Sequence, residues 1–452
     1  MTHVRPPAER SPRPLPCEGT PARAAPDPAG SGRGAAGLAA SIRDDFPILR
    51  ASFDGTPLVY LDNAATTQKP RAVLEAIVDH YSTANGNIGR GFYTLSHVAT
   101  DRYEEARASV QRALGAEHPD EVVFTGGTTG AINLLADTFG RRLVGAGDEV
   151  AVCGMEHNSN LLPWRRLCEE AGARLVVVPV NDRGRVGLAD FTAALGPRTR
   201  LAAVAHVSNV LGTVNPVREM ISTAHRAGVP VVVDGAQAVP HRPVDVRELG
   251  ADFYCFSAHK VYGPTGVGVL YGRRDLLAEL PPYQVGGGTV KGVAHDRPVS
   301  YVPVPARLEA GTPDVAGAVG LAAALRYVGD LGWDAVQEHD AALVQYAVGT
   351  LREIPRVRVV GSPEETPSGI VSLVVEGIHP YDVGGHLDRH GVAVRSGVHC
   401  ASTFLDDLGL LGTVRLSFGV YNTTAELDLV AEALRTVRPG VWTHEHPNTR
   451  FL

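Results

Sequence analysis

Seven short, predominantly apolar segments constrain what this chain can fold into. Such runs are typical of strands buried on both faces of a mainly parallel sheet. The segments begin at Glu121, Asp148, Ala173, Thr199, Val229, Asp252 and Gly266, and helical stretches accompany them at 101–114, 131–139, 162–171 and 217–227. The alternation predicts an α/β fold with crossover helices and a mainly parallel, mixed, seven-stranded sheet. Because no helix separates the last two segments, we expect these two strands to pair differently.

The pattern changes after residue 317. A long helical stretch covers 318–351, and short segments with mixed strand and helix character follow it. The strand-like ones are 357–361, 369–377, 392–397 and 414–421, and the helical ones are 381–390 and 425–437. This texture predicts a second, smaller domain of the α+β class.

These patterns divide the chain into five regions. We expect a disordered tail rich in Pro, Ala and Arg at 1–40, a segment packed on the smaller domain at 41–60, the large domain at 61–310, the smaller domain with a cysteine-containing loop at 311–440, and a C-terminal tail at 441–452. An organelle transit peptide is the alternative for the first region. Glu9, Glu18 and Asp27 weaken that alternative, because such peptides avoid acidic residues.

The composition excludes several function classes. A formal net charge of −7 provides no basic field for nucleic acid. No apolar run approaches the about 20 residues of a membrane helix, and no signal-peptide core is visible near Met1. The five cysteines are odd in number and scattered, at Cys17, Cys153, Cys168, Cys255 and Cys400, which does not resemble a disulfide framework. We therefore expect a cytoplasmic protein with reduced thiols and no metal, nucleic-acid or membrane partner.

A carboxylate and a lysine follow two neighbouring apolar segments. Asp234 lies in Val233-Asp234-Gly235-Ala236-Gln237, and Lys260 ends Phe256-Ser257-Ala258-His259-Lys260. An anion at such a place keeps a pyridinium nitrogen protonated, and a lysine amine becomes a nucleophile when burial depresses its pKa. Ser257 and His259 are candidates for binding phosphate oxygens. Taken singly, a structural strand-end Asp and a surface Lys remain the alternatives.

The segment Gly126-Gly127-Thr128-Thr129-Gly130-Ala131 lies between a predicted strand and a predicted helix. Backbone N–H groups at a helix start, together with two hydroxyls, make a cradle for phosphate. The spacing is neither that of a P-loop nor that of the G-x-G-x-x-G dinucleotide fingerprint. The segment therefore indicates a phosphate-bearing ligand and argues against a Rossmann dehydrogenase.

A cysteine lies close to arginines in the predicted smaller domain. The segment is Arg395-Ser396-Gly397-Val398-His399-Cys400-Ala401, and Arg415 follows downstream. Arginine binds an amino-acid carboxylate with two parallel hydrogen bonds. We expect Cys400, on a glycine-containing loop beside His399 and Arg395, to be exposed and partly thiolate. A buried structural cysteine is the alternative if the residue is considered alone.

Together these segments resemble the group II (SufS-like) cysteine desulfurases, fold-type I PLP-dependent enzymes of the aminotransferase class V family. The resemblance runs from Asp45-Phe46-Pro47 to Tyr421-Asn422-Thr423 and is carried also by 60–67 (YLDNAATT), 155–157 (MEH), 206–213 (HVSNVLGT) and 309–313 (EAGTP), besides the segments around Asp234, Lys260 and Cys400. It implies pyridoxal 5′-phosphate (PLP) as cofactor. It also implies conversion of L-cysteine to L-alanine, with the sulfur carried as a persulfide to an acceptor.

The resemblance also implies a role for each matching residue. Lys260 would hold PLP covalently and move protons, Cys400 would be the nucleophile, and His157 would stack on the ring with proton transfer as a second role. Other cofactor contacts would come from Asp234 at the pyridinium nitrogen, Gln237 at the ring oxygen, and Thr128, Thr129, Ser257 and His259 at the phosphate. Thr312 would reach the phosphate of the partner subunit in a homodimer. Asn209 and Arg415 would orient the substrate, with Arg395 near its carboxylate.

Several positions depart from the family pattern. Gly89 and Tyr93 stand where histidines are common, Gly127 and Gly130 where charged residues are common, Val398 where His is frequent and Ala258 where Gly is usual. None of these changes removes a group that the reaction needs. The first two would lie near the mouth of the site, which leaves the sulfur acceptor open between a SufE- or SufU-like protein and a pathway-specific carrier. It leaves open equally whether the role is iron–sulfur cluster assembly or synthesis of a sulfur-containing metabolite.

Other functions are compatible with parts of the pattern. Selenocysteine lyase, and other class V lyases or epimerases acting on amino acids, would use the same cofactor site. An epimerase has no use for a nucleophilic thiol, so Cys400 favours a desulfurase over it. A non-catalytic partner of sulfur assembly would have no reason to keep Lys260, Asp234, His157 and Cys400 together.

Overall fold

The computed structural model describes residues 35–53, 55–89 and 91–439. The expected tails lie outside these residues, except that 35–40 form most of helix α1 (Ala35–Ile42) and are not the disordered chain that we expected. The described residues cluster as one compact unit, so the boundary expected at residue 310 stays a proposal.

The large sheet has seven strands, as the seven apolar segments predict. Its strand order is β4-β10-β9-β8-β7-β5-β6, with bounds β4 Val122–Thr125, β5 Glu149–Cys153, β6 Arg174–Val178, β7 Thr199–Ala205, β8 Val231–Asp234, β9 Phe253–Ser257 and β10 Gly268–Gly272. Neighbouring strands from β9 to β6 are parallel, whereas β10 is antiparallel to both β9 and β4. Because no crossover helix separates β9 from β10, the chain can only turn back between them. The different pairing that the sequence predicts is therefore confirmed.

Both faces of this sheet are buried. Alternate residues of a strand belong to different core clusters: Val122 and Phe124 pack on one side, whereas Val123 packs on the other. Helices cover both sides: α3 (Thr94–Ala113) and α8 (Val217–Arg226) belong to the first cluster, and α4 (Thr128–Leu135) and α6 (Asn158–Ala171) belong to the second. This double burial explains why the strands lack alternating polar residues.

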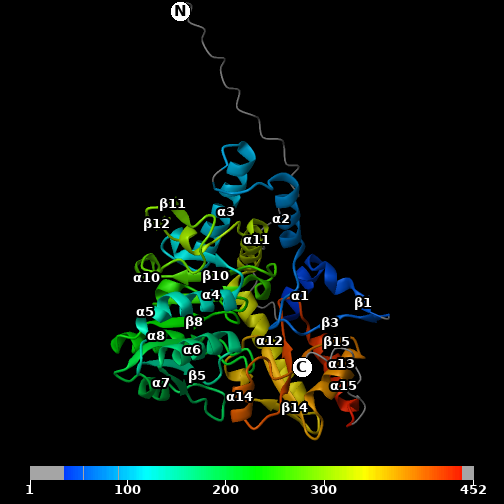
Figure 1. The fold of residues 1–452 in the computed structure, drawn as a ribbon. Helices are drawn as coiled ribbons and strands as arrows, with labels where there is room; N and C mark the ends of the chain where they lie inside the picture. The colour runs from blue at the N-terminus through cyan, green and yellow to red at the C-terminus, as the bar shows by residue number, and fades with distance from the viewer. Residues whose placement is uncertain (1–34, 54, 90, 440–452) are drawn as a thin grey trace, which may run out of the picture. The chain divides into compact units, whose positions relative to one another are not determined.

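A smaller sheet supports the C-terminal part of the chain. It is antiparallel, in the order β13 (Val357–Val360), β14 (Ile370–Val375), β17 (Thr413–Ser417) and β16 (Arg395–Gly397), and it packs with α13 (Pro380–Asp388) and α15 (Thr424–Thr436). In Figure 1 these elements, in orange and red, lie across helix α12 (Trp333–Arg352) from the green strands of the large sheet. The segment 392–397 is divided, since β15 (Val392–Ala393) pairs in parallel with β3 (Val59–Tyr60) near the start of the chain.

The expectation of one helical stretch at 318–351 is wrong. Helix α11 (Val315–Leu331) and helix α12 (Trp333–Arg352) meet at a bend of 80°. Gly332 lies between them with a φ of 83°, a left-handed conformation that favours glycine and ends a helix. Among the described residues no single helix is both long and apolar enough to cross a membrane, and this bent pair meets the two conditions only when its halves are taken together.

Candidate active site

A cavity of about 320 Å³ lies where the parallel strands end. Ala205 ends β7, Asp234 ends β8 and Ser257 ends β9, and all three side chains line it. Ligands of open α/β sheets bind at this edge. The cavity brings together every candidate site residue except Thr312, namely Thr128, Thr129, His157, Asn209, Asp234, Gln237, Ser257, His259, Lys260, Arg395, Cys400 and Arg415.

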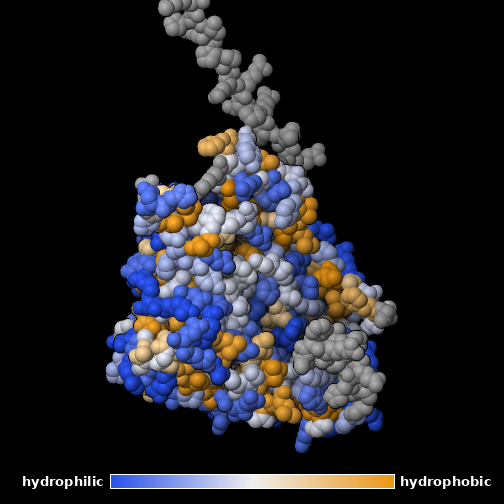
Figure 2. All heavy atoms as spheres, in the orientation of Figure 1, coloured by the Kyte–Doolittle hydropathy of each residue, from blue (hydrophilic) through white to orange (hydrophobic). Residues whose placement is uncertain are grey.

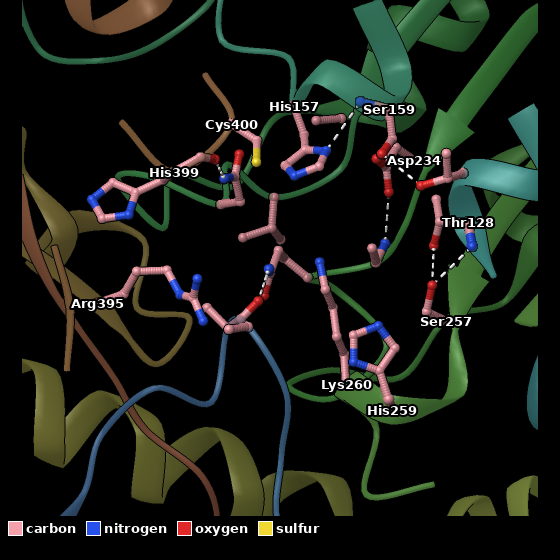
Figure 3. A pocket seen from close by; sticks show the side chains of 18 of the residues that line it. Thr128, His157, Ser159, Asp234, Ser257, His259, Lys260, Arg395, His399 and Cys400 are labelled. Carbon is pink, nitrogen blue, oxygen red and sulfur yellow. Dashed lines mark hydrogen bonds between the residues drawn. The ribbon is translucent and has the colours of Figure 1, made fainter. Parts of the chain in front are cut away.

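One end of the cavity is built from hydroxyl groups at the start of α4 (Figure 3). Thr128 donates its backbone N–H to Ser257 Oγ at 2.8 Å, and the two hydroxyls lie 2.7 Å apart. Thr129 Oγ1 lies 2.7 Å from the hydroxyl of Ser159, a residue that the sequence did not single out. A Cβ at Gly268 would lie 2.5 Å from Gly127 Cα, so the neighbouring strand can approach this turn only through glycine. The result is a compact cluster of hydrogen-bond donors at a helix N-terminus, which suits an anion.

Asp234 lies deep in the cavity wall, 7% exposed. Its Oδ1 accepts the N–H of Ala236 at 2.9 Å, so this oxygen also stabilises the turn that follows β8. Burial raises the pKa of Asp234, and the charge of Lys260 opposes that rise. Next to it, Gln237 donates to the carbonyl of Ala64 at 2.7 Å, while its Oε1 is buried without a partner among the described residues.

Lys260 extends its amine into the centre of the cavity (Figure 3). Burial lowers its pKa to about 8, although Asp234 pulls in the other direction. The backbone before it is fixed, because the His259 carbonyl accepts hydrogen bonds from Thr67 N at 2.9 Å, Thr67 Oγ1 at 3.0 Å and Thr66 Oγ1 at 3.1 Å. Both threonines belong to the segment 60–67, whose contribution to the site is thus to hold the lysine turn.

His157 is the N-cap of α6, and its Nδ1 accepts the backbone N–H of Ser159 at 3.1 Å. Burial lowers the pKa of His157 to about 4, and the nearby charge of Lys260 contributes. The imidazole is therefore neutral at physiological pH, with Nε2 carrying the proton. Behind it, the buried Glu156 accepts hydrogen bonds from Ala205 N and Asn160 Nδ2, both at 2.7 Å, and so connects β7 to α6 beneath the cavity.

Cys400 is the exposed cysteine among the four that the structure describes, whereas Cys153, Cys168 and Cys255 are buried. Its backbone is left-handed, with a φ of 54°. Two bonds hold the turn: Asn158 N donates to the Cys400 carbonyl and Asn209 Nδ2 donates to the His399 carbonyl, both at 2.8 Å. This strained turn directs the thiol into the cavity, on the side of Arg395 and opposite the hydroxyl cluster (Figure 3).

His399 is next to Cys400 in the chain but places no positive charge beside the thiol. Its ring points away from the sulfur (Figure 3), and its Nε2 lies 2.8 Å from Thr413 Oγ1. Burial lowers the pKa of His399 to about 3, aided by the neighbouring charges of Arg415 and Arg395. The cations near the thiol are therefore the two arginines and Lys260.

A testable consequence concerns stability in acid. Because the pKa of His399 is lowered in the folded chain, the unfolded chain binds the proton first as the pH falls below about 6.5, and stability is lost. From about pH 7 to about pH 5 the free energy of unfolding should fall in both proteins, as measured by urea denaturation. The fall should be up to about 2 kcal/mol smaller in His399→Asn than in the wild type. His295→Asn, at an exposed histidine in a surface turn, is the control and should follow the wild type. An equal fall in H399N and wild type would contradict the prediction.

Thr312 lies apart from the cavity. It is exposed and borders a separate hollow together with His80, Tyr81, Tyr93 and Leu95. Within one chain it therefore does not meet the hydroxyl cluster around Thr128.

The residues that the sequence reasoning missed are Asp62, Glu156 and Ser159. Asp62 and Glu156 belong to the quoted motifs, but nothing in the sequence assigned them a duty. Asp62 binds both Arg395 and Arg415. Ser159 follows His157 by two positions, and a hydroxyl so close to a helix N-terminus is the signal that could have found it.

Comparison with known proteins shows the family to which the chain belongs. The model of the aminotransferase class-V family matches residues 59–430. A protein named probable cysteine desulfurase from Mycolicibacterium paratuberculosis is 46% identical over 401 residues, which cover 89% of this chain and 58% of that protein. Another of that name, from Halalkalibacterium halodurans, is 43% identical over 398 residues, covering 88% of this chain and 97% of that protein. The chain thus spans little more than half of the first relative and nearly all of the second.

Solved structures show the same kinship. The apo cysteine desulfurase from Thermococcus onnurineus superposes with a TM-score of 0.83 at 37% identity, and the cysteine desulfurase CsdA from Escherichia coli with 0.80 at 38%. Each comparison covers 88% of this chain and 97% of the other. This chain therefore belongs to the aminotransferase class-V family of fold-type I enzymes, among its group II cysteine desulfurases.

Proposed function

We propose that this chain binds PLP and converts L-cysteine to L-alanine, with the sulfur transferred to Cys400 as a persulfide. The observation that carries the proposal is the meeting of three groups in one cavity: the Lys260 amine, the buried Asp234 carboxylate and the exposed Cys400 thiol. An amine and a carboxylate alone would serve many reactions. The thiol favours a reaction in which sulfur is the atom transferred.

The residues present fit PLP. The hydroxyls of Thr128, Ser257 and Thr129 at the start of α4 would hold its phosphate, with His259 beside them. A carboxylate as buried as Asp234 calls for a positively polarised partner, which a protonated pyridinium nitrogen would be. The orphaned Oε1 of Gln237 and its remaining amide N–H are available to a ligand in the same wall. When bound, PLP supplies an electron sink that stabilises a carbanion at the substrate Cα.

The chain's own residues would do the rest. Lys260, with its pKa lowered to about 8, is neutral often enough near physiological pH to take the Cα proton and return it. Asn209 and Arg415 line the same cavity and would orient the substrate. The Cys400 thiolate attacks the substrate sulfur, an S–S bond forms as the Cβ–S bond breaks, and Cβ receives a proton. The carbon is reduced as the sulfur is oxidised, so the transfer needs no external oxidant.

We extend the proposal to a homodimer. Helix α2 (Arg71–Thr83) exposes Leu74, Val78 and Tyr81 at a spacing that places them on one face, and Tyr93 and Leu95 at the start of α3 are also exposed. In Figure 2 hydrophobic residues appear at the upper end of the molecule, where Figure 1 has α2 and α3. Thr312 borders the same face, so it would contact a second copy of the chain that packs there. Light scattering of the purified chain measures the oligomeric state.

The sulfur would pass from Cys400 to an acceptor protein, for which the exposure of the thiol leaves room. The conversion itself is tested with purified protein, PLP, L-cysteine and a reductant. We expect a yellow protein that releases alanine and sulfide in equal amounts. Absence of both products would contradict the proposal.

A further inference from the structure

Two arginines of the cavity share one carboxylate. Asp62 accepts hydrogen bonds from Arg395 Nε at 3.1 Å and Arg395 Nη2 at 2.8 Å, and also from Arg415 Nη2 at 3.3 Å. The side chain of Asp62 is 14% exposed, that of Arg415 3% and that of Arg395 49%. Arg395 is thus the member of the trio with most freedom to leave.

The register of the small sheet forces the two arginines together. Arg395 on β16 is directly opposite Arg415 on β17. Like charges at opposite positions of an antiparallel pair repel each other. Asp62 lies beside β17 through a backbone bridge to Ser417, and its own carbonyl accepts the N–H of Ala65 at 3.1 Å. The shared carboxylate is therefore held by the backbone at the point where it offsets this repulsion.

Asp62 does not use all the donors of either guanidinium. Arg415 Nη1 donates to the carbonyl of Asn209 at 2.8 Å, but its Nε is buried without a partner in the part of the chain that the structure describes. No described residue bonds Nη1 of Arg395. Each arginine is thus fixed at one edge and keeps a donor, and both side chains line the cavity. Two fixed cations with free donors form a receptor for an anion of carboxylate size.

We propose that Asp62 is a positioning residue that holds Arg395 and Arg415 together as the receptor for the substrate carboxylate. The proposal deepens the proposed function, since it names the residue that organises recognition of the amino acid. Without the Asp62 carboxylate, the half-exposed Arg395 turns toward solvent, and only Arg415 is left to bind the carboxylate of the substrate. Binding of ligands that carry a carboxylate then weakens, whereas binding of ligands without one does not.

The test is Asp62→Asn in the holoenzyme, with two small thiols as probes. 3-Mercaptopropionate has the carboxylate and lacks the amine, and cysteamine has the amine and lacks the carboxylate. By isothermal titration calorimetry we expect D62N to bind 3-mercaptopropionate about tenfold more weakly and cysteamine unchanged. The KM for L-cysteine should rise about tenfold while kcat changes by less than about threefold.

The matched control is Asp137→Asn. Asp137 Oδ1 also bridges two arginines, Arg141 at 3.2 Å and Arg166 at 2.7 Å, and its side chain is 22% exposed, but it lies outside the cavity. D137N should bind both probes as the wild type does. Asp62→Glu keeps the charge and displaces it by one methylene. It should therefore weaken the binding of 3-mercaptopropionate less than D62N does. It tests the same point if D62N does not fold.

Three outcomes would overturn the proposal. Unchanged binding of 3-mercaptopropionate to D62N would show that Asp62 does not organise the receptor. Tighter binding would mean that Asp62 competes with the substrate. Equal loss of both probes, with a lowered melting temperature, would make Asp62 a general structural residue. A wild type that makes no alanine would contradict the proposed function alone, because the calorimetry does not depend on turnover.

Discussion

Lys260→Ala is expected to abolish conversion of L-cysteine to alanine, with a loss on the order of 10⁴-fold in kcat. The amine of Lys260 extends into the centre of the cavity, and burial lowers its pKa to about 8. A neutral amine, which covalent attachment and proton transfer both need, is therefore present near physiological pH. Alanine formation is measured with and without added PLP. Borohydride reduction followed by peptide mass analysis reports whether the cofactor is attached to the peptide that contains Lys260.

Lys69 offers a close comparison. Burial lowers its pKa to about 8 as well, but its amine bonds Thr66 Oγ1 at 3.2 Å and it does not line the cavity. Lys69→Met should therefore keep the cofactor attached at Lys260, even if the turn that Lys69 supports is loosened. Attachment of PLP to the K260A variant at another residue, with alanine still formed, would show that Lys260 is not the cofactor lysine.

Cys400→Ala is expected to remove persulfide formation entirely and to lower desulfuration by on the order of 10³-fold or more. The thiol is exposed in the cavity, on a left-handed turn held by Asn158 and Asn209. The other three cysteines that the structure describes are buried and do not line the cavity, so none of these three can replace it. Because Lys260, Asp234 and the hydroxyl cluster are untouched, C400A should still bind PLP and still change its absorbance when L-cysteine is added. Alkylation after a single turnover, followed by mass analysis, locates the persulfide.

The control for this experiment is Cys168→Ala. Cys168 is buried in α6, and burial raises its pKa to about 11, so it is not available as a nucleophile. C168A should retain persulfide formation on Cys400. If C400A still released alanine at the wild-type rate, a thiol other than Cys400, such as the added reductant, would accept the sulfur. Release of pyruvate, ammonia and sulfide without alanine would indicate a lyase that eliminates sulfide from the substrate. An epimerase would be indicated if C400A only racemised its substrate.

Much of the architecture could be predicted from the sequence because it depends on the local pattern of apolar residues. Strands buried on both faces read as continuous apolar runs, which is why all seven strands of the large sheet were predicted, including the reversed pairing of the last two. The motifs around Asp234, Lys260 and Thr128 follow strand ends, and strand ends of a parallel sheet meet at one edge. Their convergence on one cavity was therefore predictable. The break at Gly332 was not, since a single glycine inside a helical pattern is also tolerated without a bend.

Local sequence pattern is enough to predict the α/β scaffold, the lysine and the carboxylate at its edge, and a cysteine close to arginines. How those polar groups are paired depends on the folded chain. Asp62 and Arg395 are 333 positions apart, and they come into contact because β3 pairs with β15 and Asp62 forms a backbone bridge with Ser417 on β17. His399 adjoins Cys400 in the chain yet turns to Thr413, because a left-handed backbone sends consecutive side chains in different directions. Charge pairing and side-chain direction depend on neighbours distant in sequence, and local pattern carries no information about them.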